Sequence, residues 1–269
     1  MEITTEYDIY KYGNRYRLMT DGRYYNMNTK RILSFISALA LSVSNAFKKA
    51  LTLEFEKQNK IEELKYDLIE TFAHIIEWSD KYTGLHIQRT SKYVELIAKK
   101  LAENGYYKNE LTPEYIKLMV SAAPLHDVGK INVPNNILCK NGKFTPDEFE
   151  IMQTHSRTGY NIIINELSRF EDENYVKLAS QMALYHHERW DGSGYPNKIK
   201  EKEIPLCGRI MAAADVLDAL LSKRQYKEKF SIEETFRIFD EQRNRQFESC
   251  IVDAVFALKD EIAEIDASN

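Results

Sequence analysis

The chain has 269 residues, a formal net charge of -4 and three cysteines. This length allows one good-sized domain plus an accessory segment, but not two full enzymes. The slight acidic excess excludes binding of duplex nucleic acid or anionic membranes through bulk electrostatics. Scattered cysteines in an odd number are typical of reduced thiols in a cytoplasmic protein. The acidic, polar N-terminus lacks the basic start and apolar run of a secretory signal.

The first third of the chain predicts an accessory segment, residues 1–79. Residues 1–29 alternate tyrosine-rich runs with Tyr-Gly-Asn and Asp-Gly turn signals, which predicts a small, irregular hairpin or strand-like extension. From Lys30 to Ser79 neither proline nor glycine occurs, and apolar residues recur at helical spacing, so we expect one long helix. Its uncharged stretch Ile32–Phe47 is too short and too serine-rich to span a membrane, so we expect a buried helix there.

The middle of this expected helix carries a narrow apolar seam within the charged run LEFEKQNKIEELKYDL. Such a seam packs on the chain's own domain or pairs with its copy in a homodimer, and both readings stay open. After Ser79 helical patterns follow one another to the C-terminus without an alternating strand pattern of comparable length. Residues 80–269 therefore predict an all-α domain. The expected helices are 86–104, 113–126, 146–167, 173–188, 207–222, 231–243 and 246–264.

Five of the six histidines lie beside polar or acidic residues at the ends of the expected helices. They are His86, His126, His155, His186 and His187. The sixth, His74, lies inside an apolar helical stripe. Any one such histidine is more often a satisfied or surface residue than a metal ligand. Their combination with nearby acids indicates a metal site.

The segment LHDVGK places His126 and Asp127 directly after an apolar run, at the expected end of a buried helix. A buried carboxylate needs a partner, because an unpaired charge in the interior is very costly. A metal cation is one such partner. A helix cap or an ion pair with Lys130 is the alternative.

The segment HHERWDGSGYP is more specific. Adjacent histidines on a helix point about 100° apart, so we expect one of His186 and His187 to bind metal and the other to serve a neighbouring ion or the substrate. Gly192, Gly194 and Pro196 make a loop whose backbone can approach a phosphate closely. A loop that merely terminates a helix is the alternative.

A second buried acid follows in RIMAAADVLDALLSKRQYK. Asp215 comes after three alanines and is the better candidate ligand, while Asp218, three residues on, is as well suited to cap or brace a neighbouring element. Beyond this helix, Arg224 and Lys227 stand where basic side chains could meet phosphate. A solvated surface pair is the alternative.

Five segments, in this order, resemble the HD-GYP subgroup of the HD-domain phosphohydrolases, bacterial enzymes typically directed at cyclic di-GMP. The resemblance runs from Asp80 to Lys227, with a weaker helical match to Leu258. It implies an all-α HD-domain helical bundle with a GYP loop. The segments are TGLHIQR (Thr83–Arg89), LHDVGKINVPNNIL (Leu125–Leu138), GKFTPDEFEIMQTH (Gly142–His155), HHERWDGSGYP (His186–Pro196) and IPLCGRIMAAADVLDALLSKRQYK (Ile204–Lys227).

The resemblance implies a metal site in which Asp127 bridges two ions. It assigns to the first ion His86, His126, Asp127 and Asp215. To the second it assigns His155 and His186, with His187 completing the cluster or facing the substrate. Nitrogen and oxygen ligation suits iron, manganese or zinc, and the family favours iron or manganese.

The resemblance also implies substrate contacts. It casts Asp127 and Lys130 as the catalytic residues, with Lys130 touching the phosphate or the leaving group. The remaining expected substrate contacts are the anchors Arg224 and Lys227 and the pocket-bordering loop residues Gly194, Tyr195 and Pro196.

Two positions depart from the family pattern. Members with three metals have a glutamate four residues before the first histidine, where this chain has Tyr82. We therefore expect two metals, and hydrolysis of cyclic di-GMP to the linear dinucleotide pGpG rather than to GMP. Glu248 stands where an aspartate is common, which bears on packing.

Two other functions stay open. One is a catalytically weak HD-GYP module that binds nucleotide or a signalling protein partner, and the other is a phosphohydrolase for another cyclic dinucleotide or nucleotide.

Overall fold

The structure is a computed structural model that describes residues 8–12, 15–20, 23–27, 29–78, 85–168, 172–222 and 229–267. Contacts divide the chain into two compact units, Met1–Leu64 and Lys65–Asn269. Each unit is described by itself below.

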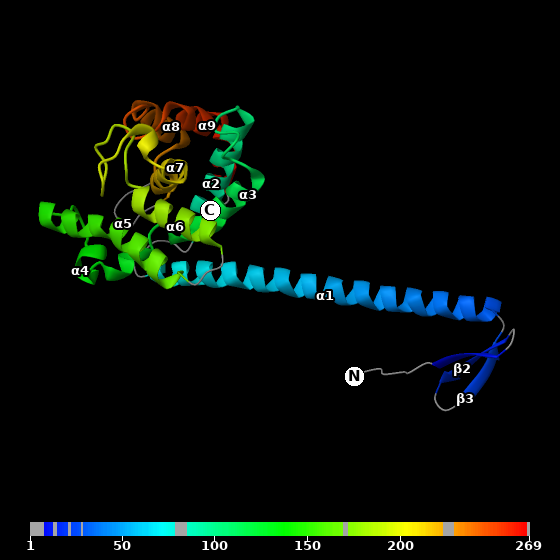
Figure 1. Ribbon diagram of the computed structural model, residues 1–269. Helices are drawn as coiled ribbons and strands as arrows, with labels where there is room; N and C mark the ends of the chain where they lie inside the picture. The colour runs from blue at the N-terminus through cyan, green and yellow to red at the C-terminus, as the bar shows by residue number, and fades with distance from the viewer. Residues whose placement is uncertain are drawn as a thin grey trace. The chain divides into compact units, whose positions relative to one another are not determined.

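The first unit begins with a small antiparallel sheet. Its strands are β1 (Asp8–Tyr12), β2 (Arg15–Thr20) and β3 (Arg23–Met27), in the order β1-β2-β3 (Figure 1). Tyr10 pairs with Arg17, and Leu18 pairs with Tyr25. The hairpin predicted from the turn signals is present and is extended by a third strand, so this segment is more regular than the sequence indicated.

The long helix α1 (Thr29–Trp78) matches the predicted one closely. The burial predicted for its uncharged stretch is wrong: Leu41, Val43 and Phe47 are 64%, 61% and 64% exposed. A lack of charge does not by itself bury a helix, and among the described residues no apolar neighbour covers these side chains. In the described part of the chain, no helix is both long enough and apolar enough to cross a membrane.

The described residues of the second unit form helices throughout, which confirms the all-α prediction. The predicted block 246–264 is two helices, and the connection after Asp127 contains short helical turns. Besides the end of α1, the helices are α2 (His86–Glu103), α3 (Pro113–Ala122), η1 (Ala123–Leu125), η2 (Val128–Asn132), α4 (Asn135–Leu138), α5 (Pro146–Glu166), α6 (Glu173–Tyr185), η3 (Glu201–Glu203), α7 (Leu206–Leu221), α8 (Ile232–Glu241), α9 (Ser249–Ala257) and α10 (Lys259–Ala267).

Several helices begin at polar residues that cap free backbone N–H groups. Thr145 and Glu148 form a reciprocal capping box at the start of α5. The side chains of Thr112, Asp172 and Ser231 accept hydrogen bonds from the first turns of α3, α6 and α8. The capping box fixes where α5, the helix that carries His155, begins.

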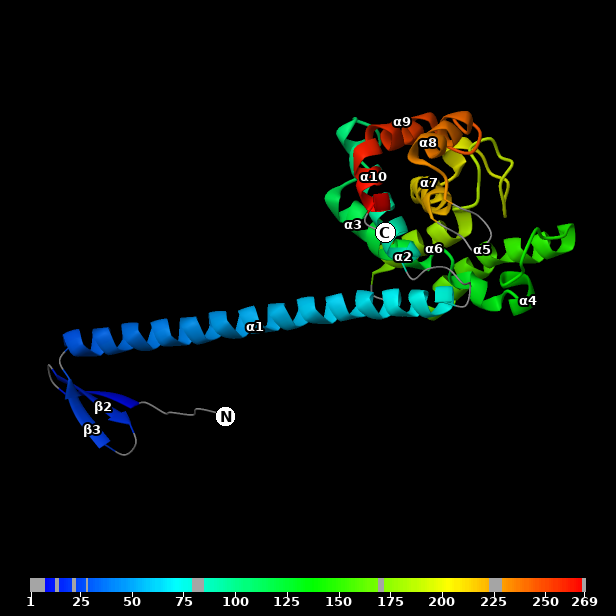
Figure 2. The ribbon, with the colours of Figure 1, turned by 180° about the vertical axis from the view of Figure 1, so that it is seen from behind.

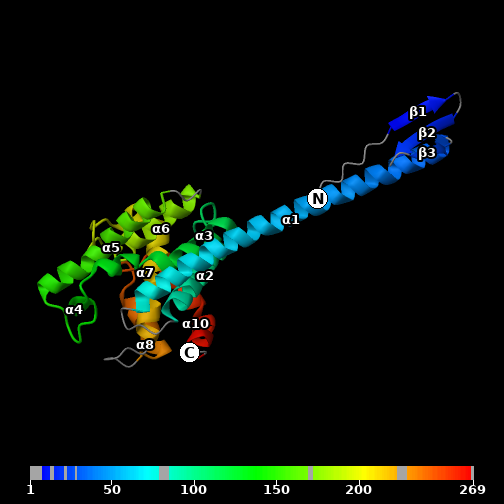
Figure 3. The ribbon, with the colours of Figure 1, turned by 90° about the horizontal axis from the view of Figure 1, so that it is seen from below.

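Helix α7 is the centre of the core. It packs against α2, α6 and α8, and Figures 2 and 3 show it surrounded by these helices. Ala213 and Ala214 are fully buried, and a side chain at Gly208 would lie 2.9 Å from the Cβ atom of Tyr185. Small residues thus let α7 approach its neighbours closely, which brings the acids of α7 next to the first turn of α2.

The backbone of the turn η2 packs so closely on the backbone of α5 that no side chain fits between them. A Cβ atom at Gly129 would lie 2.0 Å from the carbonyl oxygen of His155 and 2.4 Å from the backbone nitrogen of Gly159. Only glycine fits this contact. It holds Asp127, two residues before Gly129, beside His155 of α5.

Replacing Gly129 with alanine is expected to lower the free energy of unfolding by about 1–3 kcal/mol, because the methyl group must push two backbones apart. Urea unfolding measures this change. Gly159→Ala is the control, since its Cβ atom would meet neighbours at 3.3 Å and a smaller loss follows. Equal losses in the two variants would contradict the account.

Candidate metal centre

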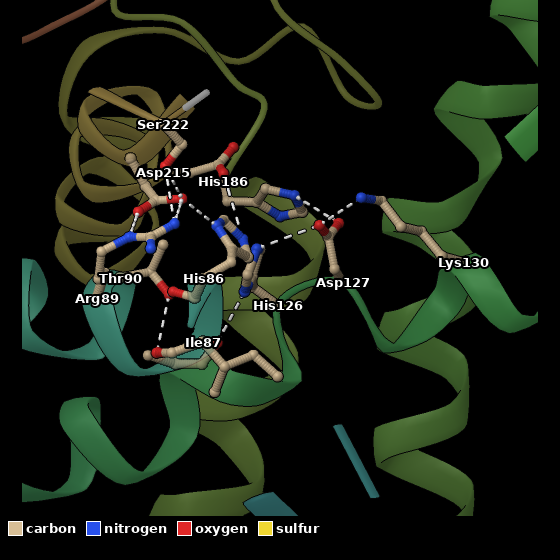
Figure 4. Close-up of polar contacts among 12 residues, drawn as sticks. His86, Ile87, Arg89, Thr90, His126, Asp127, Lys130, His186, Asp215 and Ser222 are labelled. Atoms are coloured by element: carbon tan, nitrogen blue, oxygen red, sulfur yellow. Dashed lines mark hydrogen bonds and ion pairs between the residues drawn. The ribbon is translucent and has the colours of Figure 1, made fainter. Parts of the chain in front are cut away.

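Asp127 lies where the chain changes direction between two short helical turns. His126 and Asp127 stand between η1 and η2, directly after α3, as predicted for the end of a buried helix. Lys130 lies one turn on, with its Nζ atom 2.8 Å from Asp127 Oδ2. Figure 4 shows His126 and His186 on one side of the Asp127 carboxylate and Lys130 on the other. The ion pair considered from the sequence therefore forms, but it occupies only one of the two oxygens.

Four imidazoles are oriented by hydrogen bonds at their Nδ1 atoms. His126 Nδ1 lies 2.8 Å from the carbonyl oxygen of Ala123, and His155 Nδ1 lies 2.6 Å from that of Met152. His186 Nδ1 lies 3.0 Å from the carbonyl of Met182. His86 Nδ1 instead meets the Asp218 carboxylate at 2.6 Å. A carbonyl partner requires the proton on Nδ1, which leaves the Nε2 lone pair available as a metal ligand.

The Nε2 atoms gather around Asp127. Those of His155 and His186 lie 3.3 and 3.6 Å from Asp127 Oδ1, and that of His126 lies 3.2 Å from Oδ2. Asp127 Oδ1 and His126 Nε2 are buried without a hydrogen-bond partner in the described part of the chain. Buried polar atoms normally have a partner. An all-nitrogen-and-oxygen donor set with orphaned acceptors therefore fits a divalent cation.

The donor atoms form two groups that share Asp127. Within each group the donor atoms lie within 4.8 Å of one another. One group is His86, His126 and Asp127, and the other is Asp127, His155, His186 and His187. This arrangement could hold metal on both sides of one carboxylate.

Burial and nearby charges set the protonation of Asp127 and of the histidines around it, which together are called the cluster below. Burial acts to raise the pKa of Asp127, but the Lys130 ammonium and His126 outweigh it and hold that pKa well below its usual value. Burial acts to lower the pKa of His126, and the Asp127 carboxylate overcomes it and raises that pKa to about 9. A metal ion that binds His126 would therefore displace the proton from Nε2. Burial lowers the pKa of His186 and His187. Asp127 is thus ionised, and these last two imidazoles are neutral donors near pH 7.

His186 and His187 point the same way, contrary to the helical argument. Their ring centroids are 4.0 Å apart, and both belong to the group around Asp127. Helix α6 ends at Tyr185, so helix geometry alone does not set how the two rings lie. Which of the two histidines would bind metal stays a prediction. His155 differs too: it lies in the middle of α5, not at a helix end.

The two aspartates of α7 have different surroundings. Asp215 Oδ1 lies 3.8 Å from His86 Nε2, on the His86 side, but Asp215 is not among the donor residues that lie within 4.8 Å of one another. Asp218 is 1% exposed and accepts hydrogen bonds from Arg89 as well as meeting His86. Arg89 also donates to Ser222 at 2.7 Å. Asp218 therefore braces His86, which the sequence left open, and Arg89 in turn braces Asp218.

The loop after His187 folds over the cluster. A Cβ atom at Gly194 would lie 2.4 Å from the backbone nitrogen of Arg189 and 2.6 Å from the carbonyl oxygen of His187. The close approach that glycine permits is therefore to the loop's own backbone. It places the Tyr195 ring in a stack on His187, with centroids 4.7 Å apart. Pro196 follows Tyr195 through a cis peptide bond.

Glu188 anchors the far side of this loop, a role that sequence reasoning missed. It is 2% exposed, and its Oε1 atom accepts hydrogen bonds from the backbone of Asn197 at 2.6 Å and Lys198 at 3.1 Å. Burial raises the pKa of Glu188. The only sequence signal was its place directly after the two histidines.

The Glu248 position has the packing role that the sequence indicated. Glu248 forms a buried ion pair with Arg209 and accepts a hydrogen bond from the Tyr107 hydroxyl. Tyr82, Arg224 and Lys227 lie outside the described residues, so their predicted roles stay predictions. The end of α1 is a further element that sequence reasoning missed, because Ala73 and Ile76 line a pocket with His86 and Asp127.

The HD domain family matches residues 70–251, more than half of the sequence. The chain belongs to the HD domain family. The matched range contains all of the histidines and aspartates of the cluster, so the HD domain and the candidate metal centre coincide.

Two relatives and one solved structure show what this HD domain is similar to. A cyclic di-GMP phosphodiesterase of Vibrio cholerae is 39% identical over 210 residues, 78% of this chain and 43% of that protein. The 3'3'-cGAMP-specific phosphodiesterase 2 of the same organism is 37% identical over 219 residues, 80% of this chain and 40% of that protein. The chain thus spans less than half the length of these two relatives.

The solved structure is a cyclic GMP-AMP specific phosphodiesterase of V. cholerae. It aligns with a TM-score of 0.53 at 18% identity, over 75% of this chain and 52% of that one. This likeness shows the fold.

Removing the negative charge of Asp218 is expected to weaken metal binding. Asp218→Asn keeps the shape but loses the ionic hold on His86 and Arg89, so affinity for Mn²⁺ should fall about 10–100-fold, as for other partners that orient metal-binding histidines. Isothermal titration measures this. Asp260→Asn, at an exposed acid of α10, should leave the affinity unchanged, and an unchanged affinity in Asp218→Asn would contradict the bracing role.

Proposed function

We propose that this HD domain is a metal-dependent phosphodiesterase that hydrolyses cyclic di-GMP to the linear dinucleotide pGpG. The observation that carries the proposal is the ionised Asp127 carboxylate, whose Oδ1 atom is buried without a partner among the described residues and faces Nε2 atoms of histidines from two other helices. The identity of the substrate rests on the similarity to the V. cholerae cyclic di-GMP phosphodiesterase. In this proposal residues 80–269 are the catalytic domain, and residues 1–79 are accessory.

The proposed cofactor is a pair of divalent ions, iron or manganese, with zinc as a third choice. His86, His126 and Asp215 would hold one ion, His155, His186 and His187 would hold the other, and Asp127 would serve both. Such a pair supplies a nucleophile at neutral pH and stabilises charge on the phosphate oxygens during an in-line displacement. The grouping of the donor atoms on two sides of Asp127 supports this assignment for the histidines, and the 3.8 Å distance between Asp215 Oδ1 and His86 Nε2 supports it for Asp215.

The chain's own residues would position the substrate and the leaving group. The Lys130 ammonium lies beside Asp127 Oδ2, where it would donate a hydrogen bond to a nonbridging or leaving oxygen of the phosphate. Gly194, Tyr195 and Pro196 would border the pocket, because the stack of Tyr195 on His187 places this loop beside the cluster. Arg224 and Lys227 would anchor the second phosphate.

Incubation with cyclic di-GMP tests the proposal. Purified protein loaded with iron or manganese should convert it to pGpG, resolved by chromatography, and a chelator should abolish the reaction until metal is restored. Asp127→Ala should reduce turnover to background, because it removes the carboxylate shared by both donor groups. Lack of turnover by a folded, metal-loaded protein would overturn the proposed phosphodiesterase activity. It would favour the alternative of a module that binds nucleotide or a signalling partner.

The same assay separates the remaining alternatives. Faster turnover of 3'3'-cGAMP than of cyclic di-GMP would indicate that 3'3'-cGAMP is the preferred substrate, as the name of the second relative states for that protein. Metal analysis near two ions per chain is expected. A value near three, or GMP as the main early product, would contradict the role assigned to Tyr82.

A homodimer through α1 and a cytoplasmic location belong to the same proposal. The three cysteines are free, which fits a reducing compartment. In the second unit α1 packs Tyr66, Ile69 and Ala73 on its own core, while Leu68 and Ile75 are 58% and 59% exposed. With Ile61 these two recur every seven residues, the spacing of a coiled-coil seam.

Sedimentation should therefore give a mass twice that of the 31.5 kDa chain. Leu68→Lys should produce monomers, because it places a charge in the seam. Asn59→Lys adds the same charge outside the seam and should remain dimeric. A monomeric wild-type protein would contradict the dimer while leaving the proposed catalysis intact.

A further inference from the structure

Phe149 is an exposed aromatic residue next to the loop that covers the cluster. It lies in the first turns of α5 and is 46% exposed. Its ring meets the Tyr195 ring edge to face, with centroids 6.2 Å apart and planes at 81°. A large apolar ring is therefore held in a fixed place, with nearly half of its surface open to solvent.

Tyr195 connects Phe149 to the metal-binding histidines. The Tyr195 ring stacks on His187 at 4.7 Å and 28°, and it meets His155 edge to face at 6.3 Å. The aromatic surface thus begins at the buried histidines and ends at Phe149 in solvent.

This surface lies where a nucleoside attached to a bound phosphate would extend. A phosphodiester hydrolysed at Asp127 carries a ribose and a base on each side, and the base must leave the cluster towards solvent. Unpaired bases are bound by stacking on aromatic side chains, and an aromatic face accepts any base. Phe149 contacts the Tyr195 ring and is itself both aromatic and exposed to solvent, so a base could stack on it.

We infer that Phe149, together with Tyr195, is a stacking surface for one purine base of the dinucleotide substrate. The inference rests on the proposed function and adds a binding residue to it. Stacking supplies affinity for the nucleoside while leaving the choice between guanine and adenine to other contacts. The other role open to Phe149 is apolar packing that supports Tyr195.

Substitutions at Phe149 separate these two roles. Phe149→Ala is expected to lower the ratio of kcat/KM for cyclic di-GMP to kcat/KM for methyl p-nitrophenyl phosphate, which carries no base, about 10-fold, as for the loss of one stacked base. The loss should appear mainly in KM. Phe149→Leu keeps the apolar packing but has no aromatic face, so it should lower this ratio as much as Phe149→Ala does. Phe149→Trp keeps an aromatic face and should leave the ratio at the wild-type value.

Ile151→Ala is the matched control, because Ile151 is a second exposed apolar residue of α5 at 39% exposure, and its ratio should not change. A wild-type ratio in Phe149→Leu would overturn stacking and establish packing. So would an equal loss in Ile151→Ala.

A binding measurement keeps this inference separate from the proposed function. In Phe149→Trp, titration with GMP should quench the added tryptophan fluorescence in a saturable way, while ribose 5-phosphate should not. Phe149→Leu corrects for Trp78 and Trp190. If wild-type protein fails to hydrolyse cyclic di-GMP, the proposed function fails while GMP quenching still supports a base-binding surface. Absence of quenching would overturn the surface itself.

Discussion

The Asp127 carboxylate carries a negative charge inside the second unit, and the arrangement of the surrounding helices depends on it. An ionised carboxylate away from water needs compensating charge and hydrogen bonds. Lys130 and His126 meet Oδ2, whereas Oδ1 faces His155 and His186 without a hydrogen bond from any described residue. In His86, His126, His155 and His186 the Nδ1 atom meets a carbonyl or a carboxylate, so the Nε2 atom faces the site where a cation could bind. The core therefore has a His/Asp cluster that could hold a metal ion.

Backbone packing, more than side-chain choice, places the ligands. The contact of Gly129 with α5 fixes Asp127 against His155, and Gly194 folds the loop so that Tyr195 covers His187. His86 comes from the first turn of α2, which Asp218 and the small residues of α7 hold close. These contacts are short-range and steric, and they fix the candidate ligands relative to one another.

The sequence predicted the all-α domain because helical spacing is a local signal. It also singled out the residues that the structure brings together around Asp127, and their role as metal ligands stays a prediction. An apolar run followed by His126 and Asp127 is readable without a structure. The bracing role of Asp218 could not be predicted, because Asp215 and Asp218 lie on one helical face. In the structure Asp218 meets the Nδ1 atom of His86, whereas Asp215 approaches its Nε2 atom. The shared direction of His186 and His187 depended on where α6 ends, which is a boundary that sequence reads poorly. Whether Phe47 is buried depends on which other segments pack against α1, and the local sequence of the helix does not contain that information.

Anomalous diffraction from crystals of manganese-loaded protein would locate bound metal ions. We expect two manganese peaks on opposite sides of the Asp127 carboxylate, one next to His86 and His126 and the other next to His155 and His186. A peak bound only elsewhere, or a cluster in which Asp127 touches no metal, would contradict this expectation.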